Sequence, residues 1–128
     1  SMCRVLTILL AISLSLAFVS CKKYRAKRIS GFYECEVNSY NWGFYSGRTD
    51  TTYTEMMEIT RDGENIEFNH KTIPANDLWK KSYRKDEGGR YYFTMEIIED
   101  RLIYHAEGGG RGGGFEQDIV GKKIENVK

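Results

Sequence analysis

Apolar and polar side chains alternate along most of the chain from residue 29 onward, and this period-two pattern constrains the fold more than any other feature. In residues 29–38, Tyr33, Cys35 and Val37 fall on one side of an extended chain, whereas charged or amide side chains fall on the other. Such alternation is typical of strands that bury one face, and no stretch shows a convincing helical period. We therefore predict an all-β domain in which the face of Tyr33 is buried.

Turn sequences divide this pattern into seven strands, or eight. The Asp62-Gly63 pair is typical of a tight hairpin, a second turn is expected at 86–89, and residues 73–78 could hold one helical turn. Strands are expected at residues 29–38, 50–60, 65–70, 79–85, 90–98, 101–107 and 115–120. Because the connections are short, we predict an antiparallel meander that closes into a small barrel or folds as a sandwich.

Gly31-Phe32-Tyr33 stands at the start of the first strand and is similar to the Gly-x-Trp opening of lipocalin-type barrels, with Tyr in place of Trp. The resemblance implies a small lipocalin-like barrel. It concerns the fold alone, because one fold can carry many functions.

Residues 5–19 form an apolar run without a charged side chain, followed by Ser20, Cys21 and two lysines. The run has the length of a signal-peptide core and is shorter than the roughly 20 residues that span a membrane. Its end, Phe18-Val19-Ser20-Cys21, resembles the lipobox of bacterial lipoproteins, in which a small residue precedes a cysteine that becomes acylated. The resemblance implies cleavage before Cys21 and attachment to a membrane through acyl chains on this residue.

This interpretation divides the chain into a signal peptide (1–20), the lipidated Cys21 with a basic tether (21–28) and a single β domain (29–128). It places the domain in the bacterial cell envelope, facing the periplasm or the exterior. Two alternatives remain. Five basic residues follow the apolar run against Arg4 before it, which by the positive-inside rule would favour an uncleaved anchor with a cytoplasmic domain. Cleavage without lipidation would instead give a secreted protein.

Composition limits the classes of partner that the domain is expected to bind. Without the signal peptide the chain carries 18 basic and 18 acidic residues, so it lacks the basic excess of nucleic-acid-binding proteins, and no nucleic acid partner is expected. Cys35 would be the only cysteine in the β domain, which excludes an internal disulfide. A lone cysteine on a strand is expected to be a small buried apolar residue.

The residue types used in catalysis are few. The two histidines, His70 and His105, lie on predicted strands without a nucleophile motif or a spaced set of metal ligands. Several acidic residues alternate with apolar ones, which is typical of a solvated face; they are Glu96, Glu99, Asp100 and Glu107. We therefore expect no enzyme activity, no metal and no cofactor.

Six glycines surround Arg111 in the segment 108–114. The segment lacks the Lys-Ser/Thr ending of a nucleotide-binding loop. It is expected to be a flexible hairpin or a strand that crosses another closely. A mobile lip over a ligand pocket is the alternative.

Three aromatic residues, Tyr40, Trp42 and Phe44, continue the exposed side of the first strand. We predict a bulge near Ser39 that turns them inward. Without it they form an exposed patch that would suit a sugar, a hydrophobic ligand or a partner protein. The candidate contact residues are Tyr40, Trp42, Phe44, Tyr45 and Arg111.

These observations lead to two hypotheses for a non-enzymatic, lipid-anchored envelope protein. A carrier of a small ligand would contain a cavity lined by aromatic residues, namely Tyr33, Tyr53, Phe68, Tyr91 and Phe93. An interaction module or hydrolase inhibitor would have a solid core and a protruding segment 40–45. Tyr33-Glu34-Cys35 resembles the Tyr-x-Cys of some small barrel lipoproteins that inhibit hydrolases.

Overall fold

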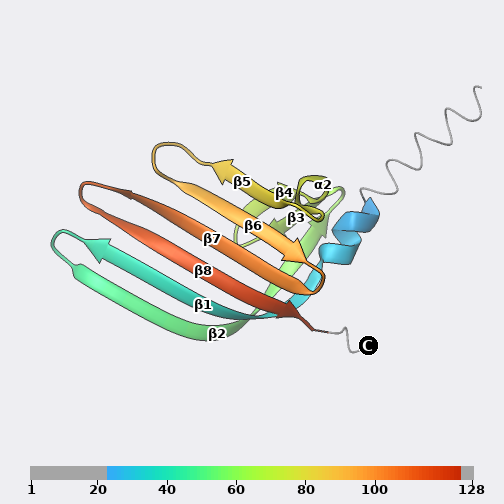
Figure 1. Ribbon diagram of the computed structural model, residues 1–128, viewed down its shortest axis with the longest axis horizontal. Coiled ribbons are helices and arrows are strands. Elements are labelled where there is room, and N and C mark those ends of the chain that lie inside the picture. Colours follow the sequence, from blue (N-terminus) through green and yellow to red (C-terminus); the bar gives the residue numbers. More distant parts are fainter. Residues whose placement is uncertain (1–22, 125–128) are drawn as a thin grey trace, which may run out of the picture.

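The computed structural model describes residues 23–124, which form one curled antiparallel sheet of eight strands (Figure 1). The strands are β1 (Gly31–Gly43), β2 (Gly47–Asp62), β3 (Asn65–Phe68), β4 (Lys71–Pro74), β5 (Ser82–Asp86), β6 (Tyr92–Ile98), β7 (Arg101–Gly110) and β8 (Gly113–Lys123). A single helical turn, α2 (Ala75–Leu78), follows β4. The predicted all-β meander is therefore confirmed, as is the helical turn within 73–78. No helix within residues 23–124 is long and apolar enough to cross a membrane.

The order of strands across the sheet is β4-β3-β2-β1-β8-β7-β6-β5. The first strand, β1, pairs with β2 on one side and with the last strand, β8, on the other. The free edges are β4 and β5, and α2 connects them along the chain. The sheet is thus a half-barrel with an open seam, across which Lys71 Nζ lies 2.7 Å from the Glu87 carboxylate.

The inner face of the curled sheet holds the core. Tyr33, Cys35 and Val37 of β1 are fully buried, as their alternation predicts. Around Tyr104 of β7, the Phe68 ring packs edge-on at 5.4 Å between centroids and the Phe93 ring stacks at 5.8 Å. Phe68 and Phe93, two of the rings expected to line a cavity, therefore pack against Tyr104 in the core. The burial of Cys35 also confirms the prediction made for the lone cysteine.

Residues 23–29 form a helix that overlaps the segment 21–28, which was predicted to be a basic tether. Ala26 and Ile29 are buried in the core of the domain. At the end of the helix, the Tyr33 hydroxyl donates a hydrogen bond to the Ile29 carbonyl at 2.7 Å, and Lys123 Nζ donates to the Arg28 carbonyl at 2.7 Å. These donors satisfy carbonyls that a helix end leaves without partners. Two apolar residues three positions apart were too short a pattern to predict the helix from sequence.

Beyond the core, the hairpins continue to the end of the sheet opposite this helix (Figure 1). At about 3.3 Å per residue, the 13 residues of β1 span about 40 Å. The register from Gly31–Ile59 to Gly43–Gly47 is continuous, so the bulge predicted near Ser39 is absent. The prediction that the rings of 40–44 turn inward is therefore wrong, because no extra residue in β1 moves its later side chains to the other face of the sheet.

Candidate binding surface

An exposed aromatic tip, consisting of Trp42, Phe44 and Tyr45, forms the end of the β1–β2 hairpin. Their exposed fractions are 41%, 75% and 97%, and the Phe44 and Tyr45 rings contact edge-on at 5.1 Å. The Phe44 amide donates a hydrogen bond to the Gly112 carbonyl at 3.2 Å, which ties this tip to the turn between β7 and β8. That turn carries the exposed Arg111. Four of the five predicted contact residues therefore meet at one end of the sheet.

The fifth predicted contact residue, Tyr40, lies farther along the outer face. Its ring lies beneath the Arg48 guanidinium at 4.6 Å. Tyr40 also lines a shallow, open hollow of about 550 Å³ between β1, β2 and β8. The hollow is polar; its other lining residues include Asn38, Arg48, Asp50, Thr52, Glu116 and Asp118.

The glycine-rich segment 108–114 is a hairpin whose glycines make room for aromatic rings. On the outer face, a methyl group added at Gly114 would lie 2.7 Å from the Trp42 indole nitrogen, and one at Gly109 would lie 3.5 Å from the same ring system. On the inner face, the Tyr91 ring lies directly against Gly108. Glycine within strands commonly marks such a close approach. The segment is therefore mostly strand, with only Arg111 and Gly112 in the turn.

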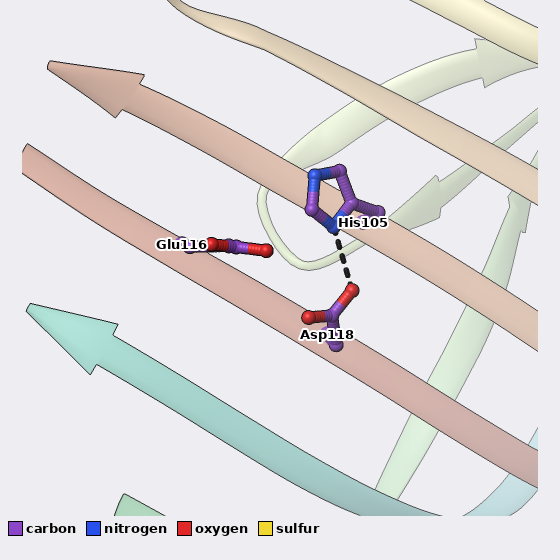
Figure 2. Close-up of side chains that lie close together, drawn as sticks. All are labelled: His105, Glu116 and Asp118. Carbon is purple, nitrogen blue, oxygen red and sulfur yellow. Dashed lines mark hydrogen bonds and ion pairs between the residues drawn. The ribbon is translucent and has the colours of Figure 1, made fainter. Parts of the chain in front are cut away.

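A polar group occupies the outer face of β7 and β8, and Figure 2 shows three of its members, His105, Glu116 and Asp118. The register places His105 opposite Asp118, and Glu107 opposite Glu116. His105 Nδ1 lies 2.6 Å from Asp118 Oδ1, the contact dashed in Figure 2. His105 Nε2 lies 3.1 Å from Glu107 Oε2. His105 is one-quarter exposed, whereas Glu107 and Asp118 are nearly half exposed.

The carboxylates change the proton affinity of this histidine. Partial burial lowers the pKa of His105, but hydrogen bonds and charge from Asp118 and Glu107 outweigh it, so the pKa is raised above its usual value. The pKa of Glu107 is lowered, first by the hydrogen bond from the Tyr92 hydroxyl and then by the one from His105. The Arg84 guanidinium in turn lies 4.1 Å from the centre of the Tyr92 ring.

From the sequence alone, His105 was expected to be an ordinary strand residue, and this group was not predicted. The available signal was parity: His105 and Glu107 share one face of β7, and Glu116 and Asp118 share one face of β8. Only the pairing of these strands shows that the two faces coincide. His70, by contrast, lies exposed in the turn between β3 and β4.

The aromatic cavity expected for a ligand carrier is contradicted. Tyr33, Phe68 and Phe93 are at most 1% exposed because they fill the core, whereas Tyr53 and Tyr91 are 41% and 47% exposed at the surface. Cys35 is buried as well, and burial together with the charge of Glu55 raises its thiol pKa to about 11. The lipid attachment predicted at Cys21 and the signal peptide lie outside the described residues.

Comparisons with known proteins give no match: no protein-family model, no curated protein and no solved structure is similar to this chain.

Proposed function

We propose that this protein is a non-enzymatic, lipid-anchored component of the bacterial cell envelope that binds a partner protein through its aromatic tip. The observation that carries the proposal is the exposure of Trp42, Phe44 and Tyr45 at the end of the sheet opposite the helix 23–29. Exposed apolar clusters are uncommon on monomeric proteins and tend to mark contact sites. Trp, Tyr and Arg are also the residue types that contribute most to protein interfaces.

The packing of the domain favours a partner protein over a small ligand. A carrier encloses most of its ligand's surface in an apolar pocket. Here Phe68 and Phe93 pack against Tyr104 in the core, and the hollow beside Tyr40 is open and polar. The tip instead projects from the sheet, with Arg111 beside it, and a projecting surface suits a groove or pocket on another protein.

The anchoring part of the proposal rests on the sequence Phe18-Val19-Ser20-Cys21 after an apolar run. An acylated Cys21 would be only a few residues from the helix 23–29, at the end of the domain remote from the tip. With about 40 Å of β1 between them, the tip would face away from the membrane surface.

Photo-cross-linking in a Gram-negative host tests the interaction. Benzoyl-phenylalanine at Tyr45 should give a discrete adduct, whereas the same probe at Ile98, an exposed apolar residue at the opposite end, should not. The captured protein, once identified and purified, should bind the wild-type domain and bind Phe44→Ser at least tenfold more weakly. Equal cross-linking at Tyr45 and Ile98, or unchanged binding by Phe44→Ser, would reject the tip as the interface.

Intact mass of the membrane-extracted protein tests the anchor separately. We expect a species that begins at Cys21 and is heavier by its acyl chains, and that disappears in Cys21→Ala. A full-length unmodified mass would establish an uncleaved anchor instead.

A further inference from the structure

We propose that His105, Glu116 and Asp118 form a binding site for a divalent transition-metal ion, of which Zn²⁺ is the best match, on the outer face of the sheet. One ligand atom from each residue lies within 4.8 Å of the others. All three side chains come from the same face of two paired strands, so the sheet holds their backbones in a fixed arrangement (Figure 2). Imidazole together with carboxylates is a ligand set that suits Zn²⁺.

The surroundings of His105 are those of a metal ligand. Histidines that bind metals usually donate their second ring N–H to a carboxylate or carbonyl, which fixes the tautomer and orients the ring. Glu107 occupies that position, 3.1 Å from Nε2. With the proton on Nε2, the lone pair of Nδ1 points toward Asp118, where the metal would bind.

The charge around the site favours a cation. Glu107 adds negative charge next to His105. Arg48, which lines the same hollow, lies 3.8 Å from Asp50, and Arg84 lies 3.2 Å from Asp86. Neither arginine therefore needs to occupy the space between the carboxylates.

The competing explanation is a simple ion pair, with a protonated His105 between Asp118 and Glu107. The 2.6 Å separation of Nδ1 and Oδ1 is the length of a charge-assisted hydrogen bond. Replacing that proton with Zn²⁺, at about 2.0–2.2 Å from each ligand, requires the two atoms to separate to about 3.3 Å. Asp118 is half exposed and can make this shift without disturbing the core. Three protein ligands then leave one coordination position for water.

Calorimetric titration with ZnCl₂ tests the proposal on the full chain in detergent, without a histidine tag and with accessible thiols alkylated. We expect one Zn²⁺ per chain, with affinity at least tenfold weaker in His105→Gln and in Asp118→Asn. Glu107→Gln should weaken binding about 10–100-fold, because that residue orients the ligand. His70→Gln, which changes the other histidine, should bind as the wild type does, and MgCl₂ should give no saturable signal.

A second measurement keeps the test independent of folding defects. On adding Zn²⁺ to the wild type, the ¹⁵N resonance of His105 Nδ1 should shift as a metal-bound nitrogen does, while Nε2 keeps its proton. Absence of saturable binding below millimolar Zn²⁺, equal affinity in His105→Gln, or a His105 resonance unchanged by Zn²⁺ would each overturn the site and leave the ion pair as the explanation.

Discussion

Gly121→Ala probes how tightly β1 and β8 pack in the core. Gly121 faces Cys35 across the β1–β8 ladder, and a methyl group at this position would lie only 2.6 Å from Cys35 Sγ. Favourable contacts need about 3.5–4.0 Å, so the two groups overlap by about 1 Å. The sulfur is on a short side chain that can move only by rotating about χ1, inside a packed core.

The expected cost follows from this overlap. Overpacking of a well-packed core destabilises a protein by about 1–3 kcal/mol. Replacing Gly by Ala also lowers the conformational entropy of the unfolded chain, which stabilises the folded state by about 0.4–1 kcal/mol. We therefore expect Gly121→Ala to lower the free energy of unfolding by about 1–2 kcal/mol. Cys35→Ala alone should cost about 1 kcal/mol, for the loss of one buried side-chain atom and the space it leaves.

The double variant is the decisive measurement. Without the sulfur the new methyl group has room, so Cys35→Ala/Gly121→Ala should be about 1–2 kcal/mol more stable than the sum of the single changes predicts. Urea denaturation of a chain that begins after Cys21, followed by circular dichroism, measures all four proteins. Gly110→Ala is the matched control, since nothing lies within 4 Å of the added methyl group. Additivity within about 0.5 kcal/mol would refute the packing argument.

Three further predictions concern other parts of the domain. Tyr33→Phe should cost about 1–3 kcal/mol, because the buried Ile29 carbonyl loses its 2.7 Å donor, and hydrogen exchange in the helix 23–29 should accelerate more than in β7. The thiol of Cys35 has a pKa of about 11 in the folded protein, against 9.0 when unperturbed. Because the thiol ionises at lower pH in the unfolded state, the free energy of unfolding should fall between pH 9 and 11. Denaturation across that range should show a shallower fall in Cys35→Ala; equal slopes would contradict the assignment. Trp42→Ala should uncover Gly109 and Gly114 and speed amide hydrogen exchange in the β7–β8 hairpin, while the urea midpoint shifts by less than about 1 M. Exchange as slow as in the wild type would show that the Trp42 ring does not hold the glycines in place.

The fold was largely predictable because alternation is a local signal. The buried side chains of β1, β3 and β6 lie where period two places them, and the turn at Gly63 follows from its sequence. Alternation shows which residues share a face but not how far a strand runs beyond the core. The extension of β1 past residue 38 and the start of β2 at residues 47–49 were therefore missed.

The candidate sites were predictable only in part. The aromatic residues of 40–45 were identified from their residue type and from the alternation along the first strand. Their exposure depended on whether a bulge was present, and a bulge leaves no clear mark in one sequence. The group around His105 depends on pairing between strands, with Asp118 13 residues away along the chain. Register across a hairpin with a glycine-rich turn is difficult to predict, because flexible backbone permits several alignments.

The pairing of the first strand with the last determines when the domain can fold. Until Gly113 and the residues after it are available, β1 and β7 each have an edge without a partner, so the half-barrel cannot form from an incomplete chain. At about 5–20 residues per second, synthesis separates the completion of β1 from that of β8 by several seconds.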